Sequence, residues 1–145
     1  MINGGVIGLG VGEQHLTALL NHPYVDNVFI WDQNPQKLAD VKSRNPKAII
    51  VEKESDIVGN SICNLVCVAS YDSDHHDQCI TCIESGQHIF VEKPVCLYLE
   101  EAKSIVNCLR ENPKVRFSSN LILRKSSRFA DLKQRIDSNE LGEIY

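Results

Sequence analysis

Short apolar segments alternate with helix-patterned segments along the chain, and this alternation limits the fold more than any other feature. The apolar segments are 5–7, 27–32, 47–52, 62–70, 88–93 and 115–120. The helix-patterned segments are 13–22, 34–45, 76–86, 99–112 and 127–142. Strands that alternate with helices pair in parallel through right-handed crossovers. The sequence therefore predicts an α/β fold with a doubly wound parallel sheet of the Rossmann type.

The boundaries of these segments have the local chemistry that such a fold requires. Residues 62–70 are almost continuously apolar, which is typical of a strand covered on both faces. Asn34 can cap the helix that follows it, and Pro35 suits the first helical position. Gly86 is a typical C-terminal stop for the helix before it.

Composition excludes several classes of partner. The chain has 145 residues and a formal net charge of -4, without a cluster of Lys and Arg that would indicate a nucleic-acid surface. No apolar run approaches the roughly 18 residues of a membrane span. The N-terminus has no basic leader before its first strand, so we expect no signal peptide. We therefore expect a cytoplasmic protein without direct nucleic-acid or membrane partners.

Six cysteines are present, and two of them, Cys79 and Cys82, form a C-x-x-C pair. Such a pair can serve in zinc binding or redox chemistry, but no second C-x-x-C accompanies it. Because the pair lies inside a helix-patterned segment, we favour small core residues with reduced thiols. A metal or redox role remains the alternative.

Glycines follow the first apolar segment at Gly8, Gly10 and Gly12, with Val11 between the last two. Glycines between a strand and a helix let backbone N–H groups approach a phosphate, and the helix N-terminus favours negative charge there. The usual G-x-G-x-x-G spacing would place the third glycine at Glu13, so Gly12 would have to act in a turn one residue shorter. The alternative is that these glycines only turn the chain.

Asp32 ends the second apolar segment, at about the distance from the glycines that the dinucleotide fingerprint requires. A carboxylate there accepts hydrogen bonds from ribose hydroxyls and repels a 2′-phosphate. No arginine follows directly to hold such a phosphate, so the sequence favours NAD over NADP. The alternative is an aspartate that only flanks the next helix. Trp31, beside it, is interpreted as a packing residue, with contact to adenine as the alternative.

Two opposite charges and a proline, Glu92, Lys93 and Pro94, end the fifth apolar segment. Residues at the carboxyl ends of parallel strands line the crevice where ligands bind. A lysine buried beside a nicotinamide can donate a proton or polarise a substrate oxygen. From the spacing alone, a surface ion pair at the strand end is an equal alternative.

The segment VEKPVCLYLEEAKSIV resembles the E-K-P segment of the Gfo/Idh/MocA oxidoreductases, the family of glucose–fructose oxidoreductase and inositol dehydrogenase. The resemblance extends to GLGVGEQH, NPQKL, VCVASYDSDHHDQCITCIESGQHIFVEKP and SSRFADLKQRIDSNELGEIY. It therefore covers nearly the whole chain. The combination of these segments is far more specific than the glycines alone.

This resemblance implies a nicotinamide cofactor on the N-terminal domain and assigns roles to several residues. Lys93 matches the catalytic lysine, and the Lys93–Pro94 bond is expected to be cis. Glu92 matches a contact near the nicotinamide ribose. Asn120 falls where the sixth strand delivers residues to the site.

The resemblance also implies that the loop after the fourth strand, with Ser70, Tyr71 and His75, borders the cofactor. The family usually has proline where Tyr71 stands. The density of acids and imidazoles around His75 and His76 permits a metal hypothesis. Because neighbours on a tight loop rarely chelate one ion, we expect no metal site and interpret His75 as a cofactor-side residue.

The resemblance divides the chain into a dinucleotide-binding domain, 1–120, and the beginning of a second α+β domain, 121–145. In the family the second domain carries partner catalytic groups and most of the substrate pocket. We therefore expect the chain alone to bind cofactor and to turn over poorly. A homo-oligomer is expected for a full-length form, because the family's second sheet usually makes that contact.

These observations predict an oxidoreductase domain that moves a hydride between a nicotinamide cofactor and a sugar, cyclitol or sugar-nucleotide hydroxyl. NAD is the expected cofactor, and a small molecule is the expected partner. Two alternatives remain open. The chain could be a dinucleotide-sensing regulator without catalysis, or a cofactor-binding subunit completed by another chain.

Overall fold

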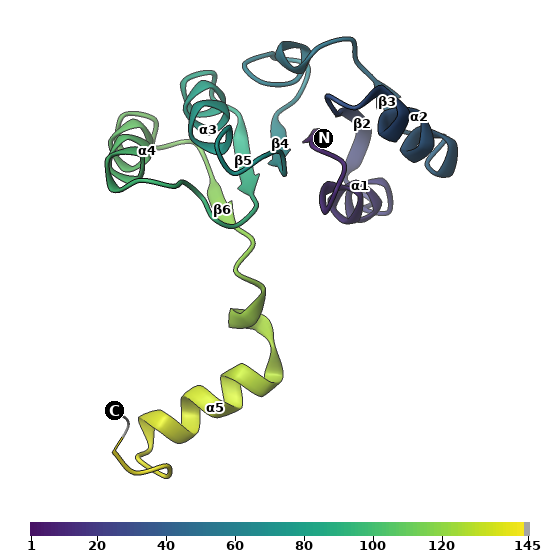
Figure 1. Cartoon of the computed structure of the whole chain (residues 1–145). Helices are drawn as coiled ribbons and strands as arrows, with labels where there is room; N and C mark the ends of the chain where they lie inside the picture. Colours follow the sequence, from purple (N-terminus) through teal and green to yellow (C-terminus); the bar gives the residue numbers. More distant parts are fainter. Residues whose placement is uncertain (144–145) are drawn as a thin grey trace.

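A six-stranded parallel sheet forms the centre of the protein in the computed structural model, which describes residues 1–143 (Figure 1). Its strands are β1 (Ile2–Ile7), β2 (Val25–Trp31), β3 (Ile49–Ile50), β4 (Leu65–Val68), β5 (His88–Val91) and β6 (Phe117–Ser119). The order is β3-β2-β1-β4-β5-β6, and all neighbours pair in parallel. The order reverses between β1 and β4, which confirms the predicted doubly wound sheet.

Helices α1 (Gly12–Leu20), α2 (Pro35–Arg44), α3 (His75–Glu84) and α4 (Leu99–Glu111) cover the two faces of this sheet. The remaining elements are helix α5 (Ser127–Asp137) and the 3₁₀ turns η1 (Glu54–Asp56) and η2 (Ile122–Lys125). Asn34 caps α2 as predicted, because its side chain accepts hydrogen bonds from the N–H groups of Gln36 and Lys37.

Two cores result, one on each face of the sheet. Val6 of β1 packs in one core with Leu16 of α1. The next residue, Ile7, packs in the other core with Ile83 of α3 and Ile105 of α4. Successive strand residues point to opposite faces, so a strand that is covered on both sides must be apolar at every position. This explains the continuous apolar runs in the sequence.

The connection from β3 to β4 differs from the prediction. The segment 47–52 was expected as a strand, but β3 contains only two residues and both are exposed. No α-helix follows β3; the connection contains η1 and buries Ile57 and Val58 against α3. Gln87 holds this connection, because its Nε2 lies 2.9 Å from the carbonyl oxygens of Ile57, Asn60 and Cys63.

The chain leaves the sheet after β6. Figure 1 shows α5 standing away from the sheet, and its main packing partner is η2. Its apolar residues Phe129, Leu132 and Ile136 are exposed. The helix ends at Asp137, whereas the sequence predicted that it extends to Gly142.

The cysteines have the core role that the sequence favoured. All six are free, and burial raises the pKa of Cys63, Cys67, Cys79 and Cys82 to about 12. Thiols with such pKa values are poor nucleophiles and poor metal ligands at neutral pH. Among residues 1–143, no group of three or more His, Cys, Asp or Glu side chains is placed to hold a metal ion. Helices long and apolar enough to cross a bilayer are likewise absent from this part of the chain.

Candidate dinucleotide site

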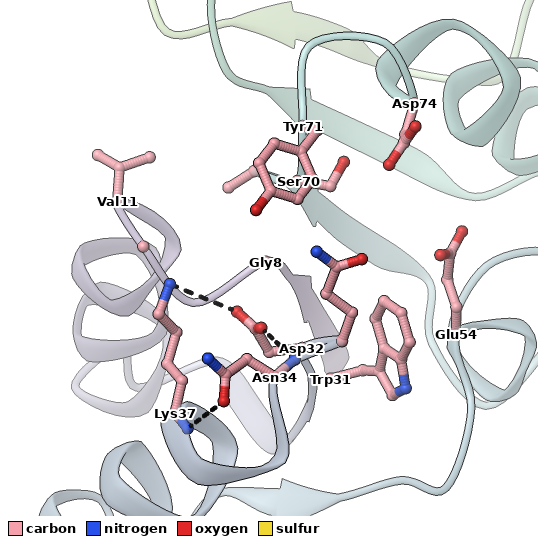
Figure 2. A pocket seen from close by; sticks show the side chains of 13 residues that line it. Gly8, Val11, Trp31, Asp32, Asn34, Lys37, Glu54, Ser70, Tyr71 and Asp74 are labelled. Carbon is pink, nitrogen blue, oxygen red and sulfur yellow. Dashed lines mark hydrogen bonds and ion pairs between the residues drawn. The ribbon is translucent and has the colours of Figure 1, made fainter.

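A pocket of about 420 Å³ opens at the carboxyl ends of β1, β2 and β4, where the strand order reverses. Its lining residues are Gly8, Gly10, Val11, Trp31, Asp32, Gln33, Asn34, Lys37, Glu54, Ala69, Ser70, Tyr71 and Asp74 (Figure 2). Ligands of open α/β sheets bind at this kind of reversal. The volume falls within the range of small-molecule and cofactor sites.

Gly8 and Gly10 have different tasks in the turn from β1 to α1. Gly8 has a φ of 79°, and a Cβ on it would overlap the carbonyl group of Ala69. Its N–H donates to the carbonyl of Trp31 at 3.0 Å. A Cβ on Gly10 would meet only the Lys37 ammonium, at 3.9 Å, so this side of the backbone is open to the pocket. A ligand can therefore approach the backbone closely at Gly10.

Gly12 explains the short glycine spacing. A Cβ on Gly12 would lie 3.1 Å from Cγ1 of Val6 and 3.2 Å from Cβ of Ala69, so the glycine permits close packing of α1 on the sheet. Glu13 points elsewhere, because its carboxylate accepts hydrogen bonds from Arg44 at 2.9 and 3.0 Å. The Arg44 guanidinium, helped by Asn45, holds the pKa of Glu13 below its usual value despite partial burial.

The first turn of α1 is suited to a phosphate group. Val11 occupies the N-cap position, and its side chain accepts no capping hydrogen bond. The backbone N–H groups at this end of α1 thus lack a side-chain acceptor and lie beside the opening at Gly10. Together with the helix dipole, they fit the pyrophosphate of a dinucleotide.

Asp32 is fixed on one wall of the pocket by backbone donors. Its Oδ2 accepts the N–H of Leu9 at 2.7 Å, and its Oδ1 accepts the N–H of Asn34 at 2.8 Å. The ammonium of Lys37 lies 3.9 Å from Oδ2, and a dashed line in Figure 2 marks this ion pair. The carboxylate is therefore oriented before a ligand binds, and each oxygen keeps acceptor capacity.

Ser70 and Tyr71 form the wall opposite Asp32 (Figure 2). The Ser70 hydroxyl donates to Oε1 of Gln78 at 2.6 Å. The Gln78 amide then donates to Glu54 at 3.1 Å. Tyr71 is exposed and flanks the pocket mouth. This wall joins the end of β4 to α3 and η1.

Several pocket residues were missed or judged differently from the sequence. Trp31 was interpreted as a packing residue, with contact to adenine as the alternative; it packs against the core and also lines the pocket. Lys37 lies one helical turn after the Asn34 cap, and this spacing places it near Asp32. The spacing could therefore have predicted that Lys37 lines the pocket. Glu54 gave no sequence signal, because it reaches the pocket through the irregular connection after β3.

Glu92, Lys93 and Asn120 lie outside this pocket, further along the same edge of the sheet, at the ends of β5 and β6. Glu92 is 5% exposed and accepts a hydrogen bond from the Asn120 amide at 2.6 Å. Lys93 is exposed, whereas the catalytic interpretation required a buried lysine and the alternative interpretation placed it at the surface. The Lys93–Pro94 bond is cis, as the resemblance implied.

His75 lies elsewhere than predicted. Its side chain is completely buried at the start of α3, and its Nδ1 lies 2.7 Å from the carbonyl oxygen of Pro94. A ring without exposed surface cannot border a cofactor directly. His75 instead stabilises the backbone at the Lys93–Pro94 bond through its contact with the Pro94 carbonyl oxygen. The resemblance placed His75 in the loop that borders the cofactor, whereas in the structure it is the first residue of α3.

Residues 2–120 match a protein family described as "Oxidoreductase family, NAD-binding Rossmann fold", which is the Gfo/Idh/MocA family. This match covers most of the chain. The chain belongs to this oxidoreductase family. The pocket at the strand-order reversal is the candidate dinucleotide site of this Gfo/Idh/MocA domain.

Two curated relatives illustrate the range of the Gfo/Idh/MocA family. The chain is 32% identical to glucose-6-phosphate 3-dehydrogenase of Bacillus subtilis over 142 residues, which are 97% of this chain and 39% of that protein. It is 27% identical to Oxidoreductase P35 of Formosa agariphila, over 99% of this chain and 45% of that protein. The chain thus spans less than half the length of these relatives.

A solved structure supports the fold of this Gfo/Idh/MocA domain. The chain superposes on scyllo-inositol dehydrogenase of Lactobacillus casei, with bound NAD(H) and scyllo-inositol, with a TM-score of 0.83 and 23% identity. The match covers 99% of this chain and 43% of that one. At this level of identity the likeness establishes the fold.

Proposed function

We propose that the chain binds NAD(H) in the pocket between the glycine turn and Asp32. The observation that carries this proposal is the open backbone at Gly10, next to the uncapped start of α1 and opposite an oriented carboxylate. The membership in a family described by NAD binding supports it. The pyrophosphate would be held at α1, and the adenosine ribose at Asp32.

The choice between NAD and NADP follows from two side chains in this proposal. Asp32 would accept hydrogen bonds from the ribose hydroxyls and repel a 2′-phosphate. The Lys37 ammonium, 3.9 Å from the Asp32 carboxylate, would reduce that repulsion. We therefore infer that the site prefers NAD over NADP by a moderate factor.

The titration of cofactor tests this proposal. Trp31 is the only tryptophan and lines the pocket, so its fluorescence should be quenched when a dinucleotide binds. NADH should bind more tightly than NADPH, and Asp32→Ser should shift the ratio of affinities by about tenfold towards NADPH. Asp26→Ser, an exposed change at the start of β2, is the matched control.

Two results would count against the cofactor proposal. If neither dinucleotide quenches Trp31 or releases heat on titration, the pocket is not a dinucleotide site. Equal affinities of the unchanged chain for NADH and NADPH would remove the role given to Asp32, although the pocket would keep its function.

We further propose that the domain serves an oxidoreductase acting on a hydroxyl of a sugar or cyclitol. The named relatives, which include a sugar-phosphate dehydrogenase and an inositol dehydrogenase, support this class. The bound nicotinamide would accept or supply the hydride. Lys93 would move a proton to or from the substrate oxygen, and residues 121–145 would begin the domain that completes the substrate pocket.

Measuring dehydrogenase activity in a longer form of the protein, which carries the second domain, tests this second proposal. NADH formation from NAD with myo-inositol, scyllo-inositol or glucose 6-phosphate as the probe should fall by at least about a hundredfold in Lys93→Met, with NADH affinity almost unchanged. Cofactor binding without turnover of any probe would favour a regulator that senses the dinucleotide. Unchanged turnover in Lys93→Met would show that Lys93 is structural.

A further inference from the structure

A buried carboxylate at the end of β5 is held by donors from α1, from the residue after β6 and from the neighbouring backbone. Oε1 of Glu92 accepts from the Asn120 amide at 2.6 Å and contacts Nε2 of His15 at 2.7 Å. Oε2 has one longer contact, 3.3 Å from the backbone N–H of Lys93. Oε1 therefore has two short contacts, whereas Oε2 has only one longer contact.

His15 reaches this carboxylate from the first turns of α1. Its ring stands edge-on to Phe90 of β5, with the ring centroids 5.1 Å apart and the planes at 77°. The side chain is 15% exposed, so packing restricts its orientation. Because an ionised carboxylate can only accept hydrogen bonds, Nε2 of His15 must carry the proton in this contact.

The hydrogen bonds decide the ionisation of Glu92. Burial raises the pKa of its carboxyl, but the donors Asn120 and His15 and the N–H of Lys93 together outweigh burial and hold the pKa below its usual value. Glu92 is therefore an anion at neutral pH. Its Oε1 is engaged by two side-chain donors, while Oε2 has only the 3.3 Å contact with the N–H of Lys93 and keeps the capacity to accept another hydrogen bond.

The location of this anion suits the second half of a dinucleotide. A dinucleotide at the reversal of strand order spans both halves of the sheet. With its adenosine half at Asp32 of β2, its other half extends over the ends of β4 and β5. That half carries a ribose whose hydroxyls need an acceptor.

We propose that His15 is a positioning residue that holds Oε1 of Glu92, so that Oε2 accepts a hydrogen bond from a ribose hydroxyl in the nicotinamide half of the cofactor. This inference rests on the proposed NAD(H) binding. It assigns a role to a residue of α1 that lies outside the glycine turn. It also assigns Asn120 to the same task, because its amide shares Oε1 with His15.

Two ligands and three variants of the whole chain test the proposal by calorimetric titration. NADH needs both halves of the site, whereas ADP needs only the adenosine and phosphate half. His15→Leu, which removes the donor, should weaken NADH binding by about tenfold and change ADP binding less than about twofold. His15→Gln, whose amide can replace Nε2 as donor, should stay within about threefold of the unchanged chain for NADH. His22→Leu is the control, since His22 is exposed and lies just beyond the C-terminal end of α1, far from Glu92 along the helix.

A fourth variant, Glu92→Gln, keeps the proposal testable if His15→Leu does not fold. Thermal unfolding should show whether His15→Leu is folded, and Glu92→Gln should reproduce its selective loss of NADH affinity with His15 intact. Selective loss in His15→Leu, or in Glu92→Gln where His15→Leu does not fold, supports the proposal when His15→Gln recovers NADH affinity.

Other outcomes overturn the proposal. They are an unchanged NADH affinity in folded His15→Leu, an equal loss of NADH and ADP affinity, and a His15→Gln variant as weak as His15→Leu. If the unchanged chain binds ADP and NADH with the same affinity, the nicotinamide half does not engage Glu92, and the proposal is also wrong. Failure of the unchanged chain to bind either ligand would instead contradict the proposed function.

Discussion

The atoms that surround a glycine decide whether a larger residue can replace it. Gly8 needs both a positive φ and the absence of a Cβ, because the carbonyl of Ala69 occupies the space that a side chain would need. Gly86 has a similar φ of 76°, but a Cβ on it would meet no atom within 4 Å. Gly86 is therefore required only for its positive φ, whereas Gly8 is required both for its positive φ and for the lack of a side chain.

We predict that Gly86→Ala costs about 1–2 kcal/mol of unfolding free energy, which is the usual penalty for a left-handed backbone. Gly8→Ala should cost clearly more and should abolish NADH binding, because the turn must move to relieve the overlap. Chemical denaturation of both variants, with a parallel NADH titration, checks the difference. Equal costs would show that the turn adapts without strain.

The ionised Glu92 predicts a pH dependence of stability. Its pKa in the folded chain is below the ordinary value of 4.5, because the Asn120, His15 and Lys93 donors outweigh burial. A group with a depressed pKa stabilises the fold at pH values above the unfolded pKa, and this contribution is lost as the pH falls through the folded pKa. Glu92→Gln should therefore differ most from the unchanged chain near neutral pH, and the difference should shrink below pH 4.5.

Denaturation by urea at several pH values measures this difference in unfolding free energy. A difference that stays constant from neutral pH to well below 4.5 would show that the Glu92 carboxylate does not contribute as an ion.

Among the elements, the connection between β3 and β4 depends most on a single polar side chain. Its backbone contains no α-helix, so its carbonyl groups need partners from elsewhere. Gln87, just before β5, supplies them with its amide and also accepts the N–H of Gly59 at 2.8 Å. Because it is 2% exposed, water cannot easily take its place.

We predict that Gln87→Leu destabilises the domain by about 3 kcal/mol or more, because a side chain of similar size would leave several buried backbone groups without partners. Gln134→Leu on the exposed face of α5 is the matched control and should change stability by less than about 0.5 kcal/mol. Thermal and chemical unfolding of the two variants measure both effects. Similar stabilities of the two variants would mean that the connection is held by its apolar residues instead.

At the scale of the whole molecule, the sheet and helices α1 to α4 pack together, whereas α5 extends away from them. No residue of α5 is buried, and its main contacts are with η2. The family match ends at residue 120, which agrees with the point where the chain leaves the sheet. The exposed apolar residues of α5 suit the proposed second domain.

We predict that a chain ending at Ser126 keeps its midpoint of thermal unfolding within about 2 °C, because it loses no buried contact. A chain ending at Pro113 should not fold cooperatively, since it lacks β6 and the buried Val115. Calorimetry of both chains checks this. A large loss of stability in the first chain would mean that α5 packs on the sheet in solution.

The order of strands and helices, the glycine turn and the placement of Asp32 could be predicted from the sequence, because each depends on local spacing. Periodicity reports which faces are covered, and a strand followed by glycines and a helix restricts the turn between them. The length of β3 and the irregular connection after it could not be predicted, because a short edge strand has the same composition as a longer one.

Only the tertiary structure decided which distant side chains share a site. His15 and Glu92 are 77 residues apart in the sequence, and no local pattern connects them. Packing likewise buried His75, left Lys93 exposed and turned Glu13 away from the phosphate turn. Sequence periodicity determines which element forms and which faces it buries, whereas partners across the sheet depend on how these elements pack in three dimensions.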